Sequence, residues 1–446
     1  MKAARKVHGF RPIGKSLHHA MGCFLTPEVW KQVRKKGTSR RIPRWDVYAL
    51  VNVALLMTWC CGDSLPEKWE AARAHYVITR SSRRRPGSTF EGFQKALRRL
   101  PMPVLRCVAD ALRGQIQRWM ESRLQVNGFI PLGCDGSRLE TPRTEELEKR
   151  LGTFGKNGAA PMIWITALVH LTSGIPWAWR FGRGGKASER DHLIQMINLL
   201  PAMAFIVADA GYVGFELIQT LMGAKVFFLI RMSSQASFYT DGDVDLETFR
   251  EGIVYYWPKQ RKERGKEPLK GRLIRVRSKE KKDVWLFTNV EDPQQLSFEL
   301  AATFYRWRWE NEGFFRTYKR TLSKVKLMSR TVRLIHREAE VSMIATQLLL
   351  CMGAQAMPHS QPKEIILCSP RKILLEVRKE MQRPESSRTP FVDRIRDCER
   401  ERRERIVPKQ KRPWPRRKVH KPPQAPNLLR LTEHDKLWLQ NYFTAT

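Results

Sequence analysis

Two aspartates stand at positions where carboxylates can act on phosphodiester bonds. Asp135 follows a short apolar run, 129–134, that predicts a buried strand, and Asp209 follows a second such run, 204–208. Burying a lone carboxylate at the end of an apolar strand is costly, which favours a functional role for each. Carboxylates are ligands for Mg²⁺, and paired Mg²⁺ ions catalyse phosphodiester chemistry. Asp-Gly is also a common turn, so a structural role stays open.

Glu312 is the third acidic candidate, and it lies on a helix predicted over 298–318. Tyr305, Arg308, Glu312 and Lys319 follow one another by steps of three, four and seven residues, so a continuous α-helix would bring them to one face. There a metal-binding carboxylate would stand beside a hydroxyl and two cations suited to phosphate. The alternative is a solvated face on which Arg308 and Glu312 form an ordinary i,i+4 ion pair.

The elements that would position these acids form a mixed α/β pattern between residues 126 and 355. Alternating apolar runs and amphipathic stretches predict strands and helices in the order strand 129–134, strand 162–171, strand 176–181, helix 189–200 capped by Ser188, strand 204–208, helix 215–222 and strand 225–231. A β-rich insertion follows, with strands at 253–257, 273–276 and 284–290, and then helices at 298–318 and 337–350. Both aspartates thus fall where strands end.

The first 125 residues predict helices only, over 47–58, 90–100 and 104–123, with Thr89 as an N-cap. The apolar stretch 47–61 is too short for a membrane span of about 20 residues, which favours a buried helix. A basic loop before Thr89 carries Arg83, Arg84 and Arg85. This loop is a candidate DNA contact, and a solvated loop on a helical bundle is the alternative.

The charge of the chain points to a polyanionic partner. Lys and Arg outnumber Asp and Glu by 81 to 44, a formal net charge of +37. Each phosphate that a Lys or Arg neutralises releases condensed counterions, so such an excess is typical of nucleic-acid binding. Composition does not choose between DNA and RNA, and an anionic membrane is a further alternative. Residues 394–421 hold 13 Lys or Arg among 28 positions and predict a flexible basic tail.

Other chemistry is less well supported. The eight cysteines contain no C-x-x-C pair, which argues against a zinc or redox motif and favours buried thiols in a reducing compartment. The glycines at 182–185 lack the Walker spacing, so no nucleoside-triphosphate site is expected.

His170 and His192 are single histidines beside apolar runs and are interpreted as structural. Arg231 ends a strand and is a candidate for phosphate contact. The basic start lacks a signal-peptide stretch, so a soluble cytoplasmic protein is expected.

The combined motifs resemble a known family. Tyr305-x2-Arg308-x3-Glu312-x6-Lys319 is similar to the YREK signature of bacterial transposases of the insertion-sequence-four superfamily. The blocks GCDGSRLETPRT (133–144) and IVADAGYVG (206–214) resemble the segments around that family's two aspartates. The second block departs from relatives that carry an Arg-Glu-Ala-Asp pattern there. The resemblance covers about 128–350 and is weak before that segment.

The resemblance implies an RNase H-like core in which Asp135, Asp209 and Glu312 hold two Mg²⁺ ions, with Mn²⁺ as a substitute. It further implies that Tyr305, Arg308 and Lys319 grip phosphates of the transposon ends. Trp285, in the insertion, is similar to a tryptophan that stacks on a flipped base in members that pass through a DNA hairpin. A strand tryptophan is also an ordinary core residue, and that alternative stays open.

The expected organisation is therefore an all-α DNA-binding domain at 1–125, a core at 126–232 and 291–355, the β insertion at 233–290 and a basic C-terminal region at 356–446. The implied function is cut-and-paste transposition, with inverted-repeat ends and target DNA as partners and a homodimer in the synaptic complex. No membrane partner is expected, and the implied location is the bacterial cytoplasm, at the nucleoid. Two alternatives remain: a transposase-derived DNA-binding protein without catalysis, and a metal-dependent nuclease that does not join strands.

Overall fold

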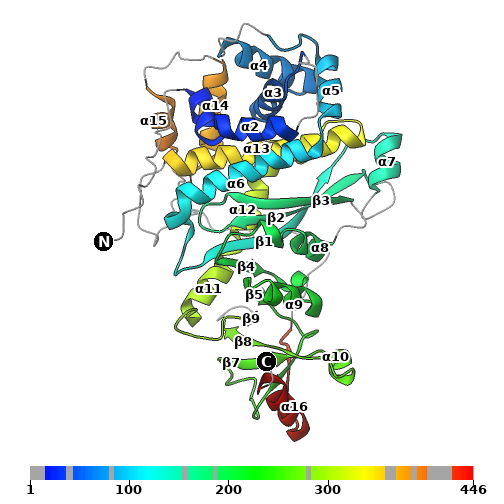
Figure 1. Ribbon diagram of the computed structural model, residues 1–446, viewed down its shortest axis with the longest axis vertical. Coiled ribbons are helices and arrows are strands. Elements are labelled where there is room, and N and C mark those ends of the chain that lie inside the picture. Colours follow the sequence, from blue (N-terminus) through cyan, green and yellow to red (C-terminus); the bar gives the residue numbers. More distant parts are fainter. Residues whose placement is uncertain are drawn as a thin grey trace, which may run out of the picture. The chain divides into compact units, whose positions relative to one another are not determined.

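The computed structural model describes residues 16–36, 44–79, 85–152, 159–183, 188–277, 283–356, 368–382, 389–398 and 424–444 (Figure 1). The chain divides into two compact units. Unit 1 comprises Met1–Gln125, Gly136–Ala187 and Asn311–Glu401. Unit 2 comprises Val126–Asp135, Ser188–Glu310 and Arg402–Thr446. Each unit is therefore assembled from segments that are far apart in the sequence.

Helices make up most of unit 1. Its N-terminal helices are α1 (Leu17–Phe24), α2 (Pro27–Lys36), α3 (Val47–Trp59), α4 (Leu65–Ile78), α5 (Phe90–Arg99) and α6 (Met102–Leu124). The predicted helices at 47–58, 90–100 and 104–123 are confirmed as α3, α5 and α6. Helices α3 and α5 begin at capping side chains: Asp46 accepts a hydrogen bond from the Ala49 N–H at 2.7 Å, and Thr89 accepts one from the Gly92 N–H at 3.2 Å.

The long helix α13 (Val332–Ala356) is the centre of unit 1 (Figure 1). It lies against α3, α5, α6 and strand β3, and most of its side chains are buried. The shorter helices of the unit are α7 (Glu145–Leu151), α12 (Glu310–Arg316, whose first residue belongs to unit 2), α14 (Pro370–Gln382) and α15 (Phe391–Arg396). The predicted helix 337–350 is confirmed as part of α13. Across the described ranges, no helix has both the length and the apolar character needed to span a membrane.

Ten strands form one mixed sheet in the order β10-β6-β7-β8-β9-β5-β4-β1-β2-β3. The first five along the chain are β1 (Ile130–Glu140), β2 (Met162–His170), β3 (Pro176–Arg183), β4 (Ala204–Ala208) and β5 (Phe227–Arg231). All five were predicted from the sequence, but β1 does not end at Cys134 as predicted: it continues to Glu140, so Asp135 lies within the strand and only Asp209 follows the end of one. Strands β1, β4 and β5 run parallel, and β2 and β3 form an antiparallel pair. Strand β1 passes from unit 2 into unit 1 after Asp135.

The segment predicted as a β insertion continues this sheet rather than standing apart from it. Its strands are β6 (Ser237–Thr240), β7 (Glu251–Tyr256), β8 (Leu269–Val276) and β9 (Val284–Thr288). Strand β9 pairs antiparallel with β5, and β8, β7 and β6 follow in turn. An unpaired edge on β5 would leave backbone donors and acceptors without partners, and β9 satisfies them.

The end of the chain contributes two elements that the sequence did not predict. Strand β10 (Asn427–Arg430) pairs parallel with β6, and helix α16 (Glu433–Thr444) follows it. Leu431 and Leu439 join a small core with Tyr239 and Trp257 of unit 2. The predicted basic tail, 394–421, begins within α15, and its residues from 399 onward lie outside the described residues.

The remaining elements of unit 2 are short helices and turns. They are α8 (Glu189–Ile194), the 3₁₀ turns η1 (Ile197–Leu199) and η2 (Ala210–Tyr212), α9 (Phe215–Gly223), α10 (Lys259–Glu263) and α11 (Phe298–Trp307), of which α11 packs against β4. Ser188 caps α8 as predicted, but the helix ends at residue 194 rather than 200. All eight cysteines are free thiols, in keeping with the sequence-based expectation.

Candidate active site

Asp135 and Asp209 come from neighbouring parallel strands. The register of β1 and β4 runs from Ile130 opposite Ala204 to Gly133 opposite Val207. Asp135 lies two residues further along β1, Asp209 is the first residue after β4, and the spacing between neighbouring strands is about 4.8 Å. Because the strands are in phase, the two side chains leave the sheet toward the same face. The two aspartates could share a metal ion only if their strands were neighbours, and β1 and β4 are neighbours.

The Asp209 carboxylate is held by the turn that follows it. Asp209 is the N-cap of η2, and its Oδ1 accepts a hydrogen bond from the Gly211 N–H at 2.8 Å. Within the described chain no hydrogen bond reaches Oδ2, so this oxygen faces no competing donor. Arg190 Nε donates to the Gly211 carbonyl at 3.0 Å from the neighbouring helix α8. The turn is thus fixed from two sides.

A buried pair of side chains lies directly beside the two acids. The Cys134 thiol donates to the Tyr212 hydroxyl at 3.3 Å, and both side chains are almost fully buried. Burial raises the pKa of Cys134 and of Tyr212 well above their ordinary ranges, and the charges of Glu189 and Asp135 add to the effect on both groups. Sequence reasoning missed Glu189, Cys134 and Tyr212, although the latter two stand within three residues of the predicted acids.

The helix that carries Glu312 is not continuous, and the prediction of one helical face for Tyr305, Arg308, Glu312 and Lys319 is wrong in this respect. Helix α11 ends at Trp307, α12 begins at Glu310, and residues 317–321 form a π-helical turn. The Arg308 and Trp309 N–H groups bond three residues back, to the carbonyls of Tyr305 and Arg306. Such tight turns have about 3.0 residues per turn, so the periodicity of an α-helix is lost there.

Tyr305 and Arg308 carry polar atoms that lack partners. The Arg308 guanidinium lies 5.6 Å from the Tyr305 ring centroid and 5.1 Å from that of Trp309. Arg308 Nε and the Tyr305 hydroxyl are buried, and among the described residues neither has a hydrogen-bond partner. Unsatisfied buried polar groups are unfavourable in free energy, and they are frequent where a ligand is bound. Both side chains are chemically suited to a phosphate oxygen.

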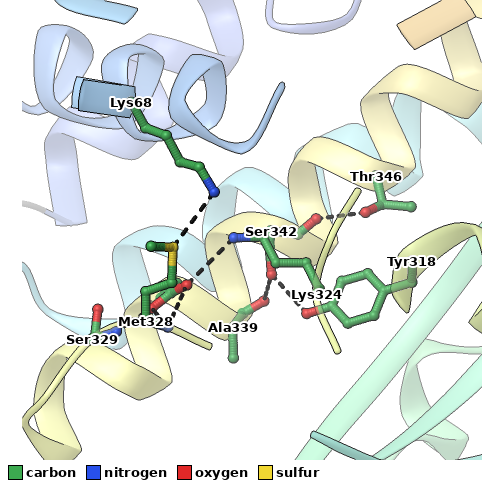
Figure 2. A network of polar contacts seen from close by, with 9 residues as sticks. Lys68, Tyr318, Lys324, Met328, Ser329, Ala339, Ser342 and Thr346 are labelled. Atoms are coloured by element: carbon green, nitrogen blue, oxygen red, sulfur yellow. Dashed lines mark hydrogen bonds and ion pairs between the residues drawn. The ribbon is translucent and has the colours of Figure 1, made fainter. Parts of the chain in front are cut away.

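Glu312 is exposed on α12, and Lys319 is half-buried on the π-helical turn. Burial lowers the pKa of Lys319, the nearby Arg138 lowers it further, and Glu140 acts in the opposite direction. Figure 2 shows how the chain after this turn is fastened to α13. The Tyr318 hydroxyl lies 2.7 Å from Ser342 Oγ, and the Glu338 carboxylate accepts from the Met328 and Ser329 N–H groups at 3.0 and 2.8 Å.

Further contacts complete this anchor. Lys324, which is nearly buried, forms an ion pair of 3.4 Å with Glu338. The Lys68 ammonium of α4 reaches Met328 Sδ at 3.5 Å (Figure 2). The segment that bears Glu312 and Lys319 is therefore anchored to the core of unit 1.

The remaining candidates vary in accessibility. Trp285 is 4% exposed and stacks on Phe249 at 5.6 Å, with the Arg275 guanidinium 5.3 Å from its ring. A base-stacking role for Trp285 stays a prediction, and it would need Phe249 or Arg275 to move aside. Arg231 ends β5 and is half-buried. Arg85 is exposed, whereas Arg83 and Arg84 lie outside the described residues.

The two expected structural histidines are buried. His170 contacts Ser173 Oγ at 2.7 Å and the Leu124 carbonyl at 2.9 Å through its two ring nitrogens. Burial lowers its pKa to about 4, so the ring is neutral at physiological pH. For His170 the structural interpretation is confirmed.

The acids divide between the units. Asp135 and Asp209 belong to unit 2, together with Arg231, Trp285, Tyr305 and Arg308, whereas Glu312, Lys319 and Arg85 belong to unit 1. Within the described residues, no group of three or more His, Cys, Asp or Glu side chains is gathered as metal ligands are. A pair of adjacent carboxylates still fits Mg²⁺, which is commonly bound by one or two carboxylates, with water and substrate phosphate as its other ligands.

Part of the chain matches a known protein family. Residues 134–348, just under half of the chain, match the family described as "Transposase DDE domain". The matched segment contains Asp135, Asp209 and Glu312. The match supports a DDE transposase, a class of nuclease and strand transferase that acts on DNA with divalent metal ions.

Among solved structures, the chain is similar to the piggyBac transposase synaptic complex with hairpin DNA. Its TM-score is 0.43 at 12% sequence identity, and the similarity covers 92% of this chain and 88% of that one. No curated protein matches the chain.

Proposed function

We propose that this protein is a cut-and-paste DNA transposase of the insertion-sequence-four superfamily, in which Asp135, Asp209 and Glu312 hold two Mg²⁺ ions. The register that sets Asp135 beside Asp209, inside the segment that matches the DDE family, is the observation that carries the proposal. The strand order β3-β2-β1-β4-β5, with β1, β4 and β5 parallel, supports an RNase H-like core.

The chemistry consists of two phosphoryl transfers. Bound Mg²⁺ would activate the attacking oxygen and offset charge on the leaving oxygen. In the first transfer water attacks a phosphodiester at the transposon end, the bond to the 3′ oxygen breaks, and a 3′-hydroxyl is released. In the second transfer that hydroxyl attacks target DNA, so that one phosphorus–oxygen bond forms as another breaks. Because both transfers are of one kind, a single set of carboxylates serves both.

The chain's own residues would position these steps. Asp135 presents its oxygens from within β1 and Asp209 from the end of β4, and the Gly211 N–H holds the Asp209 carboxylate in one orientation. Arg308 and Lys319 would bind phosphates on either side of the scissile bond, and Tyr305 would donate to a phosphate oxygen. Supporting this role, Arg308 Nε and the Tyr305 hydroxyl have no hydrogen-bond partner among the described residues.

Three variants test the assignment: Asp135→Asn, Asp209→Asn and Glu312→Gln. Each keeps the size of the side chain but removes the charge. We expect cleavage of linear DNA that carries the sequences flanking the gene to fall at least 100-fold in Mg²⁺, because losing one ligand misplaces the metal. DNA binding should persist. The exposed Asp243, which pairs with Arg430, gives the matched control Asp243→Asn, which should cleave normally.

The same assay separates the alternatives when a target plasmid is added. Cleavage followed by joining to the plasmid supports the transposase. Cleavage without joining identifies a metal-dependent nuclease, and binding without cleavage by the wild-type protein identifies a DNA-binding protein that has lost catalysis. Full activity of Glu312→Gln would remove Glu312 from the site. A dimer assembled only with paired ends, measured by light scattering, would support the expected homodimer.

A further inference from the structure

Asp135 and Asp209 are joined by a closed circuit of bonds inside unit 2. Starting at Asp209, the backbone carbonyl accepts from the Tyr212 N–H at 3.1 Å, which closes the η2 turn. The Tyr212 hydroxyl then accepts from the Cys134 thiol at 3.3 Å. Cys134 precedes Asp135 in β1, and the β1–β4 pairing returns to the strand that ends at Asp209. Of these links, only the contact between the Tyr212 hydroxyl and the Cys134 thiol is made by side chains; the others are made by the backbone.

The position of this link is where strand pairing stops. The last paired residues of β1 and β4 are Gly133 and Val207, so the ladder ends before either acid is reached. Strand β4 ends at Ala208 whereas β1 continues to Glu140, so beyond Gly133 and Val207 no β1–β4 backbone bond fixes the distance between the two carboxylates. The Cys134–Tyr212 contact lies past the last ladder pair, next to both acids, and so restrains that separation.

Burial gives the link its rigidity. Tyr212 is 0% and Cys134 is 1% exposed, so water does not compete for the contact. Deleting one partner would leave the other polar group buried and unsatisfied. Metal ligands tolerate little misplacement, since coordination distances are defined within about 0.2 Å, and groups that orient ligands without touching the metal typically change affinity by about 10- to 100-fold.

We propose that Cys134 and Tyr212 are positioning residues that fix the separation of the Asp135 and Asp209 carboxylates for metal binding. The inference rests on the proposed function, because it assumes that the two aspartates bind the metal. It does not need either residue to contact DNA or metal. This role explains why Tyr212 is a tyrosine: a phenylalanine would fill the same buried space but would lack the hydroxyl that contacts Cys134.

The test measures Mn²⁺ binding by the full chain, from the electron paramagnetic resonance signal of free Mn²⁺ without DNA. We expect Tyr212→Phe and Cys134→Ala each to weaken Mn²⁺ binding about 10-fold. Cys134→Ser keeps a donor at the same place and should bind Mn²⁺ within about twofold of the wild type. Rescue by serine is a result that a purely space-filling role of Cys134 would not give.

Thr288→Val is the matched control. Thr288 is buried in unit 2 and its hydroxyl accepts from the Val290 N–H at 3.1 Å, two strands away from β4. This variant removes a buried hydrogen bond without touching the circuit, so Mn²⁺ affinity should not change. Thermal unfolding of every variant would report the loss of stability separately. The inference is overturned if Tyr212→Phe and Cys134→Ala bind Mn²⁺ as tightly as Thr288→Val.

Asp209→Asn separates this inference from the proposed function. If the wild type binds Mn²⁺ and Asp209→Asn does not, the metal site stands, and the Tyr212 and Cys134 variants decide the positioning role alone. If Asp209→Asn binds as the wild type does, the metal assignment fails and the inference fails with it.

Discussion

Glu340 is a carboxylate in the core of unit 1 whose ionisation opposes folding. It lies on α13, it is 6% exposed, and its Oε1 accepts from Trp179 Nε1 at 3.2 Å. Burial raises the pKa of Glu340 to about 7, although the nearby Arg106 and Arg180 act to lower it. The folded protein thus holds a proton that the unfolded chain releases near its ordinary pKa of 4.5.

This shift gives a pH-dependent stability with a defined sign. Between about pH 4.5 and 7 the unfolded chain binds fewer protons at Glu340 than the folded one, so stability falls as pH rises through this window. Glu340→Gln keeps an acceptor for Trp179 and removes the titration. At pH 8 we expect Glu340→Gln to be more stable than the wild type, by an amount on the order of 1–3 kcal/mol.

Urea denaturation at pH 5 and pH 8 measures the effect. The difference in stability between variant and wild type should be larger at pH 8. Glu70→Gln, at an exposed position on α4, is the control and should leave the pH dependence unchanged. An equal shift at both pH values would contradict the assignment.

At the scale of elements, close packing between β8 and β9 holds the segment predicted as an insertion within the sheet. A Cβ atom on Gly271 would lie 2.5 Å from the Thr288 backbone carbonyl and 2.8 Å from the Phe287 ring. Backbone cannot yield as a flexible side chain does, so Gly271→Ala must displace β9. We expect this variant to lower the free energy of unfolding by about 1–3 kcal/mol.

At a second glycine, substitution by alanine should change the free energy of unfolding in the opposite direction. Gly114 lies within α6, and a Cβ there would meet nothing within 4 Å. Gly114→Ala should therefore stabilise the protein by about 0.5–1 kcal/mol, since alanine has the higher helix propensity. Chemical denaturation of both variants checks the pair. Destabilisation by Gly114→Ala, or an unchanged free energy of unfolding in Gly271→Ala, would contradict these expectations.

At the scale of the whole molecule, the net charge of +37 predicts DNA binding that weakens steeply with salt. Ten Lys and Arg residues lie between 402 and 421. Truncation from residue 394 would also remove β10 and α16, whose Leu431 and Leu439 belong to the unit 2 core. Changing the ten basic residues to Gln leaves both elements in place.

We expect this variant with ten glutamines to bind DNA with a shallower dependence of log K on log salt, by about 0.9 for each phosphate that is no longer neutralised. Titrations between 50 and 300 mM salt, roughly the range over which such slopes are measured, would give the slope. Circular dichroism would check that the fold is retained. A slope equal to that of the wild type would show that this segment does not bind phosphates.

The sequence by itself determined many of the elements of the core and which acids are candidates. Period-two and period-3.6 patterns are local, so β1 to β5 and helices α3, α5 and α6 could be recognised from residues a few positions apart. Ser188 and Thr89 marked helix starts because a capping hydroxyl bonds to an N–H only three residues on. Asp135 and Asp209 were identified because a charge ends an apolar run.

Only the tertiary structure decided how these parts combine. Pairing of β1 with β4 in the register that sets Asp135 beside Asp209 links residues 74 positions apart, and no local pattern encodes it. The broken helix before Glu312 and the link between Cys134 and Tyr212 likewise depend on packing, which can override the periodicity and propensity of a segment. Strand pairing and burial are non-local, and for that reason the sequence predicted the candidate acids but not the geometry that positions them.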